Sequence, residues 1–188
     1  MNSEESFNHW FVVPMQWLQT VPNNDGSFIA LATALFLYER YAAIKLKQRG
    51  IKATEKNIHK QIAIDFGINE HTAEDFWEVM RNGLLHQGMP KQSEQGEKKF
   101  PEWIFHHNKV DHPIELRQFQ GRTLLFVQPW DIVNKVIALW QENSELLSQN
   151  ESFPWAQVFY FESDSENTNS QYYLVTGSSS GLGMLSVK

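Results

Sequence analysis

The chain has 188 residues, of which 41% are hydrophobic and 20% are charged, and both fractions are typical of a globular domain with its own core. A length of this order corresponds to one domain, or to one domain with a small appendage. The sequence has no cysteine, which excludes a disulfide framework, a thiolate zinc site and a cysteine nucleophile. Because the formal net charge is −6, any binding of nucleic acid must depend on a local group of basic residues.

The N-terminal part of the chain predicts helices. Residues 6–21 have an apolar stripe, in which Pro14 marks a break or a first turn. Residues 27–50 predict a long helix with Ser27 as its N-cap and with Lys and Arg side chains near its C-terminal end. The longest uncharged apolar run, residues 28–38, is about half of the ~20 residues that a membrane span requires. The acidic N-terminus lacks the basic region of a secretory signal, so we expect a cytoplasmic protein without a membrane span.

Two further helices follow this long one. Residues 54–67 have a Thr before the helix and a Gly after it, which are preferred at the two ends of helices. Residues 69–86 predict a third helix, in which Asn69 is the N-cap and acidic residues occupy the first turns.

Strand patterns begin after residue 99. Residues 100–108, 113–120 and 122–129 predict strands, and the last two are joined by Gln120-Gly121 as a hairpin. Helical spacing returns over residues 129–148.

The whole pattern predicts a mainly α fold: a helical bundle with a small β insertion or appendage in the C-terminal half. The expected division is a helical domain over 1–150, which includes a β-rich insertion at about 100–128, followed by an appendage over 151–188. In this appendage, residues 155–163 and 171–177 predict a β-hairpin, and the Gly/Ser-rich end predicts a flexible tail.

Residues 172–183, YYLVTGSSSGLG, resemble the cofactor loop of short-chain dehydrogenases. That loop requires a following helix whose N-terminus faces the pyrophosphate, and then further βα units. Only five residues follow here, so no dinucleotide site and no cofactor are expected.

The histidines do not form a metal-binding pattern. His106 and His107 are adjacent in a predicted strand, so their side chains point to opposite faces of it. Known metal spacings such as His-Glu-x-x-His do not occur in the sequence, so no metal site is expected.

Arg81, Asn82 and His86 are grouped near the end of the third helix, in the segment RNGLLH. This spacing resembles the signature of HEPN domains (higher eukaryotes and prokaryotes nucleotide-binding), which are helical bundles and of which many are metal-independent ribonucleases. The resemblance covers the motif, residues 1–90 and the helix at 129–148, and leaves the β segments as insertions. It implies a homodimer with a composite site at a twofold interface, RNA as substrate, and the option of an antitoxin-like protein partner.

The residue types suit this chemistry. Cleavage of RNA by its own 2′-hydroxyl needs a proton acceptor or donor near neutral pH and a cation for the phosphate charge. We assign these roles to His86 and Arg81, with Asn82 orienting the site. Positions five apart point about 140° apart on a helix, whereas Asn82 and His86 share a face. Arg81 therefore needs to reach round, or the helix must end near Gly83, or a second subunit must complete the site.

A basic stretch extends from residue 39 to residue 60, where seven basic residues face only two acidic ones, Glu39 and Glu55. One interpretation is a solvated helix face, and the other is contact with the nucleic-acid backbone. The residues assigned to that contact are Lys45, Lys47, Arg49, Lys52 and Lys56.

A winged-helix DNA-binding regulator is an alternative. Residues 54–83 fit a helix-turn-helix, with Ala63 in the first helix, a turn at Gly67, and Ala73 and Phe76 in the core. The wing would then begin at residues 83–88 and return over 101–108. Four acidic residues in the would-be recognition helix, where phosphates approach, oppose this hypothesis.

A structural role is the third interpretation. Glu78 and Arg81 would form a surface ion pair, Gly83 or Gly88 would cap the helix, and His86 would lie favourably at its negative end. A catalytically silent HEPN-like module for binding or dimerisation belongs to this interpretation, because a fold does not by itself determine function.

Overall fold

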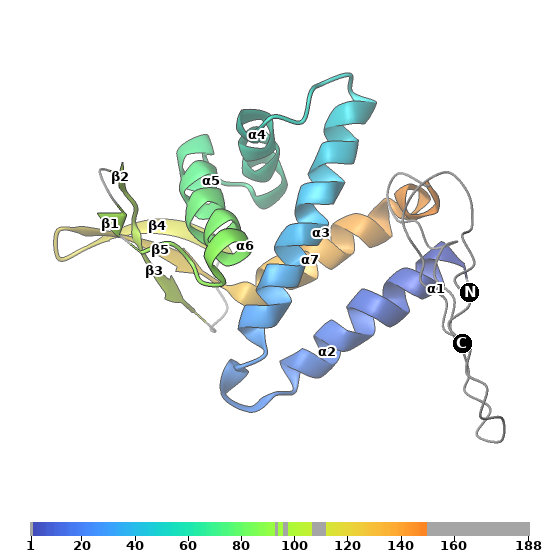
Figure 1. Ribbon diagram of the computed structural model, residues 1–188, viewed down its shortest axis with the longest axis horizontal. Coiled ribbons are helices and arrows are strands. Elements are labelled where there is room, and N and C mark those ends of the chain that lie inside the picture. Colours follow the sequence, from blue (N-terminus) through green and yellow to red (C-terminus); the bar gives the residue numbers. More distant parts are fainter. Residues whose placement is uncertain (1, 93, 96–97, 107–111, 150–188) are drawn as a thin grey trace, which may run out of the picture.

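The computed structural model describes residues 2–92, 94–95, 98–106 and 112–149, and it is mostly helical with a small sheet. Figure 1 shows the helices side by side, with the sheet at one end of the molecule and the first helix at the other. The predicted mainly α fold is therefore confirmed at this level. The predicted appendage over 151–188, with its hairpin and the dehydrogenase-like segment, lies outside the described residues.

One long helix opens the chain, formed by α1 (Ser3–Phe7), a π-helical segment (Asn8–Val12) and α2 (Val13–Gln19). Asn2 caps it, because its side chain accepts from Glu5 N and Glu5 Oε2 accepts from Asn2 N, both at 2.8 Å. Pro14 lies in the first turn of α2 and does not interrupt the helix. Since proline has no N–H to donate, the wider π turn immediately before it accommodates the missing hydrogen bond.

The central helix is α3 (Ser27–Gln48), which packs against α7 (Pro129–Glu142). Trp140 is fully buried, and its Nε1 donates to the Leu37 carbonyl at 3.1 Å. The predicted N-cap of this helix was wrong: Gly26 holds that position and Ser27 is buried in the first turn. A Cβ at position 26 would lie 2.1 Å from the Leu18 carbonyl oxygen, so the close approach of α2 requires a glycine there.

By length and composition α3 could also cross a membrane, although half of its most apolar window is buried inside the protein. The core helix of a soluble protein meets the same criteria, so this property does not decide between the two.

The next two helices are present as predicted, and they pack against each other. In α4 (Glu55–Phe66), Thr54 is the N-cap and Gly67 ends the helix with a φ of 66°. Asn69 caps α5 (Glu70–Phe76) by accepting from Thr72 N at 2.8 Å. The helix continues through a π segment (Trp77–Asn82) into α6 (Gly83–Gln87) and ends at Gly88, whose φ is 70°.

Strands lie within the range 100–128, where the sequence predicts them. They form a sheet of β3 (Glu102–Phe105), β4 (Ile114–Phe119) and β5 (Arg122–Val127) in the order β3-β5-β4, with β3 parallel to β5. β4 and β5 form the predicted hairpin, in which Gln120 and Gly121 have φ of 50° and 78°, as a type I′ turn requires. A second, short pair, β1 (Glu94–Gln95) and β2 (Lys98–Lys99), precedes them.

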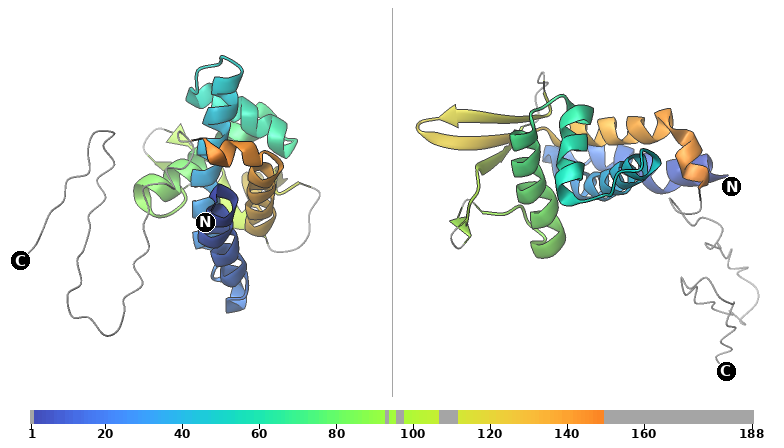
Figure 2. Two further views of the ribbon diagram at one scale, coloured as in Figure 1. Left: turned by 90° about the vertical axis from the view of Figure 1, so that its right-hand side faces the viewer. Right: turned by 90° about the horizontal axis from the view of Figure 1, so that it is seen from above.

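The sheet lies at the end of the bundle, next to α5 and α6 (Figure 2). Its buried face carries Ile114, Leu125 and Val127, which belong to the main core. Gln128 follows β5 and caps α7, because its Oε1 accepts from Trp130 N at 2.8 Å and from Asp131 N at 3.2 Å. A short 3-10 helix (Ser144–Ser148) ends the described chain.

Candidate functional site

Arg81 forms a bidentate ion pair with Glu39 of α3. Its Nη2 donates to both carboxylate oxygens at 2.6 Å, and its Nε donates to Oε2 at 3.2 Å. The Arg81 and Glu39 side chains are 18% and 33% exposed, so the pair is partly shielded from water. This contact joins α3 to the helix of the motif and neutralises the guanidinium.

The Trp77 ring lies against the face of the same guanidinium. The Arg81 Cζ lies 5.4 Å from the centre of the Trp77 ring, which is one helical turn earlier and almost fully buried. The ring is fixed in turn by an edge contact with Tyr38. A cation over a buried indole is attracted to its face. Trp77 therefore holds the face of the Arg81 guanidinium, and Glu39 holds its Nε and Nη2 edge.

Asn82 connects the motif to the start of α4. Its Oδ1 accepts from Arg81 Nη1 at 2.7 Å, and its Nδ2 donates to Glu55 Oε1 at 3.1 Å. The amide is thus engaged by Arg81 and Glu55, and no hydrogen bond to His86 is present within the described part of the chain. Within one copy of the chain, Asn82 therefore orients Arg81 and not His86.

His86 lies in the last turn of α6 and is exposed. The helix does not end near Gly83, which was one of the expected ways to bring Arg81 and His86 together. Since the contacts of Arg81 run to Glu39, Asn82 and Trp77, one copy of the chain does not assemble the three motif residues into one site.

Residues 89–91 cross the helix at Gly83 and leave no room for a side chain there; we call them the crossing segment. A Cβ at this position would lie 2.5 Å from Lys91 N and 2.7 Å from the Met89 carbonyl oxygen. Lys91 N donates to the Val79 carbonyl at 2.9 Å, whereas Gly83 N donates to Met80. The Val79 carbonyl therefore accepts from Lys91 N in place of the Gly83 amide.

The ion pair predicted between Glu78 and Arg81 was wrong. Glu78 Oε2 is instead 2.7 Å from Lys91 Nζ, and Lys91 also lies over the Phe100 ring at 4.9 Å. Both partners of this pair are largely buried, with 15% exposure for Glu78 and 18% for Lys91. Gly88 caps the helix, as the structural interpretation allowed.

A second polar network lies between α3 and α4. Tyr38 Oη donates to Asp65 Oδ2 at 2.8 Å, and Gln61 Nε2 donates to Asp65 Oδ1 at 2.9 Å. Burial raises the pKa of the Asp65 carboxyl, although these two hydrogen bonds act in the opposite direction. Burial and the neighbouring Asp65 charge also raise the pKa of Tyr38. Arg49 Nη1 extends the network to Gln61 Oε1 at 3.0 Å.

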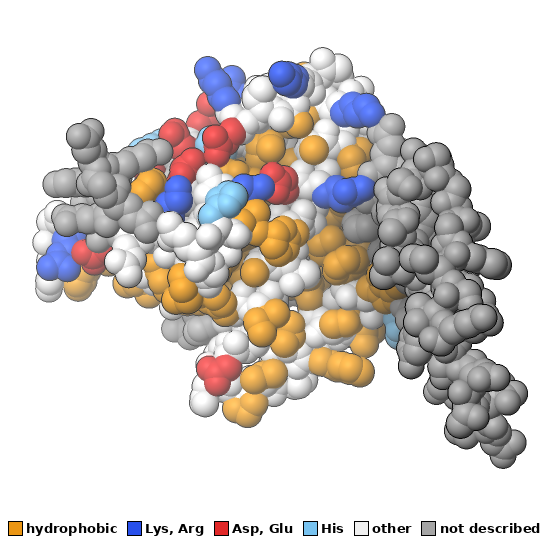
Figure 3. Space-filling model, viewed as in Figure 1, with side chains coloured by type: hydrophobic (Ala, Val, Ile, Leu, Met, Phe, Trp, Pro, Cys, Tyr) orange, Lys and Arg blue, Asp and Glu red, His pale blue; other side chains and the backbone are white. Residues whose placement is uncertain are grey.

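The five basic residues assigned to backbone contact divide into two groups. Lys45 Nζ donates to Asn143 Oδ1 at 2.9 Å and Arg49 belongs to the network above, so both have structural partners. Lys47, Lys52 and Lys56 are exposed around the end of α3 and the start of α4. On the face of the molecule drawn in Figure 3, Lys, Arg, Asp and Glu side chains lie together in the upper part, whereas the lower part is mainly hydrophobic.

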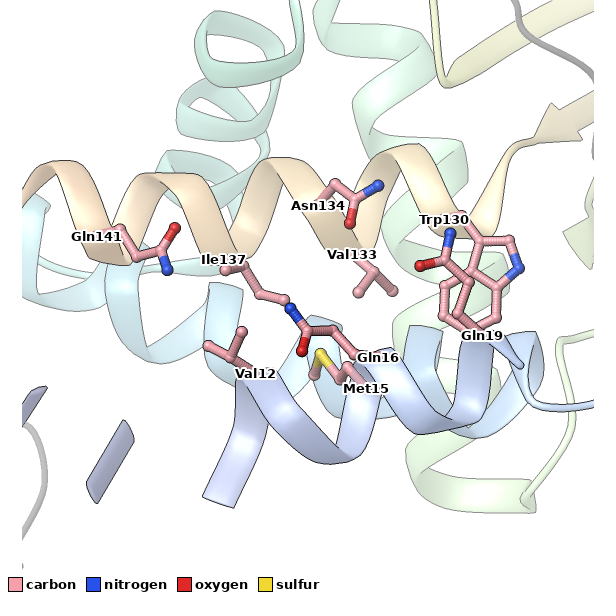
Figure 4. A pocket seen from close by; sticks show the side chains of 9 residues that line it. All are labelled: Val12, Met15, Gln16, Gln19, Trp130, Val133, Asn134, Ile137 and Gln141. Atoms are coloured by element: carbon pink, nitrogen blue, oxygen red, sulfur yellow. The ribbon is translucent and has the colours of Figure 1, made fainter. Parts of the chain in front are cut away.

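A groove between α2 and α7 lies apart from the motif (Figure 4). Its volume is about 220 Å³. The residues lining it are all uncharged: Val12, Met15, Gln16, Gln19, Trp130, Val133, Asn134, Ile137 and Gln141. Such a lining offers no group for proton transfer or phosphate charge, so the groove is not the place for the expected chemistry.

No group of three or more His, Asp or Glu side chains suited to a metal ion occurs in the described residues. Sequence reasoning missed Glu39, Glu55 and Trp77. Of these, Trp77 had a signal, because it lies four residues before Arg81 on the same helix. Searches of protein-family models, curated proteins and solved structures find no match to this chain.

Proposed function

We propose that this chain is a HEPN-like, metal-independent ribonuclease that acts on RNA as a cytoplasmic homodimer. The observation that carries the proposal is the hydrogen bond between Asn82 and Glu55 at 3.1 Å. It places the motif beside the start of α4, where Lys52 and Lys56 flank Glu55 in the sequence. Two groups that the sequence assigned separately, one to chemistry and one to backbone contact, therefore adjoin one another.

In the proposed reaction His86 accepts the proton of the RNA 2′-hydroxyl. The 2′-oxygen then forms a bond to phosphorus, the bond from phosphorus to the 5′-oxygen breaks, and the leaving oxygen takes up a proton from water. Arg81 offsets the charge that develops on the phosphoryl oxygens. Because Arg81 and His86 are apart within one copy, the proposal requires His86 of one subunit to act with Arg81 of the other.

The test is cleavage of single-stranded RNA in EDTA by the wild type and by His86→Ala. We expect cleavage by the wild type and its loss in the variant. His71→Ala is the matched control, because His71 is an exposed histidine on α5, 3.7 Å from Asp75. Equal cleavage by wild type and His86→Ala, or cleavage by neither, would contradict the ribonuclease proposal.

A silent HEPN-like module for binding or dimerisation is the second candidate. It is favoured by the ion pair with Glu39, which leaves Arg81 neutralised. This candidate predicts a dimer without cleavage, and an antitoxin-like protein as partner remains compatible with either candidate.

The segments expected to form the wing of a winged helix do not form it. The helix pair α4 and α5 is present, but residues 83–87 are helical and the strand at 102–105 pairs in parallel with β5. The segment expected to begin the wing is thus the end of a helix, because it continues the α5 helix up to the left-handed cap at Gly88.

A further inference from the structure

The donor groups of Arg81 are almost fully used. A guanidinium has five N–H groups, and the hydrogen bonds to Glu39 take those of Nε and Nη2, which form one edge of the fork. One N–H of Nη1 is donated to Asn82. A single Nη1 hydrogen is left, so Arg81 cannot bind phosphate in bidentate fashion while Glu39 is in place.

Carboxylate and phosphate bind the same edge of a guanidinium with similar geometry. We propose that Glu39 is an internal competitor of phosphate at Arg81, and that it decides whether Arg81 is available to RNA. The inference rests on the proposed function for its ligand, a phosphodiester of single-stranded RNA.

The remaining contacts of Arg81 do not compete for that edge. Trp77 contacts the face of the guanidinium and Asn82 accepts from Nη1, so both hold the group when Glu39 turns away. Glu39 is the more exposed partner of the ion pair, at 33% against 18%, and its side chain lies at the surface of α3. An exchange of carboxylate for phosphate thus needs a rotation of Glu39 without repacking of the core.

The exchange also changes the local charge. Glu39 contacts Arg81, and Glu55 contacts Asn82. Two carboxylates and one guanidinium therefore lie together at the motif. Replacing Glu39 by Gln removes one negative charge and keeps the shape and one acceptor. The expected result is stronger attraction of phosphate and a donor edge on Arg81 that only one neutral acceptor still contacts, so phosphate displaces it more easily.

The experiment measures binding of a single-stranded 2′-O-methyl oligonucleotide, which lacks the attacking hydroxyl and is therefore not cleaved. We expect Glu39→Gln to bind it at least about fivefold more tightly than the wild type at low salt. Because one more phosphate is neutralised, the slope of log affinity against log salt should become steeper by about 0.7.

Two controls isolate the role of Glu39. Glu74→Gln, at an exposed position of α5, makes the same change in net charge and should alter affinity by less than about twofold. The double variant Glu39→Gln/Arg81→Gln should lose the gain. If Glu39→Gln does not fold, Glu39→Asp, which withdraws the carboxylate by one methylene, should give a smaller increase.

The inference is overturned if Glu39→Gln binds no more tightly than the wild type, including the case in which neither binds. It is also overturned if Glu74→Gln or the double variant gains as much. Because this probe cannot be cleaved, the outcome is separate from the EDTA cleavage test, which alone decides the ribonuclease proposal.

Discussion

Replacing Gly83 by alanine should destabilise the protein, although alanine is the better helix former. The residue lies in a helix at a φ of −63°, so its backbone is ordinary and only the available space is unusual. The new Cβ would meet Lys91 N at 2.5 Å, Met89 O at 2.7 Å and Pro90 C at 2.8 Å. All three contacts are backbone atoms, which cannot rotate away as a flexible side chain would.

The expected magnitude follows from three terms. Alanine gains roughly 0.5–1 kcal/mol in helix propensity, whereas overpacking costs typically about 1–3 kcal/mol. Displacing the crossing segment also weakens the hydrogen bond from Lys91 N to Val79 O, a loss of about 1 kcal/mol. A net loss of about 2 kcal/mol corresponds to a decrease in Tm of roughly 4–8 °C for a domain of this size.

Thermal and urea unfolding of Gly83→Ala measure this loss, and amide exchange at Lys91 locates it. Gly88→Ala is the control, since position 88 has a φ of 70° but no atom within 4 Å of the new Cβ. It should cost about 1 kcal/mol through backbone strain and leave the exchange of the Lys91 amide unchanged. A Gly83→Ala protein as stable as the wild type would refute the close crossing of residues 89–91 over the helix.

Three further changes test the packing around the site. Asn69→Ala removes the cap of α5 and should lower the free energy of unfolding by about 1 kcal/mol in urea titrations, whereas Asn69→Asp should not. Trp140→Phe leaves the buried Leu37 carbonyl without its donor and should cost at least about 1 kcal/mol, measured by the same titration. Asp65 holds its proton more tightly when folded, so its contribution to stability is present at low pH and is lost as pH rises from 3.8 through the raised pKa. Unfolding from pH 4 to 7 should show the wild type losing stability relative to Asp65→Asn as pH increases, and parallel profiles would contradict the assignment.

Features that depend on nearby residues were predictable from the sequence. Thr54, Gly67 and Asn69 cap helices because their side chains or backbone freedom act within three or four positions. The hairpin at Gln120-Gly121 follows from the same kind of local rule, since a type I′ turn needs positive φ at both central residues and glycine adopts it readily. The exception is Ser27, where the approach of Leu18 from α2 shifted the helix start to Gly26.

The charge partners within the motif could not be predicted in this way. Arg81 had an acidic neighbour three residues away, Glu78, and a local rule therefore paired the two. The segment that crosses at Gly83 brings Lys91 to Glu78, and the packing of α3 brings Glu39 to Arg81 from 42 positions away. Both outcomes depend on which backbone covers the helix, and the sequence around the motif contains no sign of it.

The same ion pair makes the choice between ribonuclease and silent module a question of relative affinity. The residue types of the motif suit RNA cleavage in either case, but an Arg81 that prefers Glu39 to phosphate adds little to a transition state. If the carboxylate leaves when RNA binds, the energy of breaking the pair is taken from binding, so affinity is lower than the count of basic residues suggests. A weakly binding wild type together with a tightly binding Glu39→Gln variant would thus indicate a site that is closed at rest. In such a site, Arg81 would act together with His86 of a second subunit only after RNA has displaced Glu39.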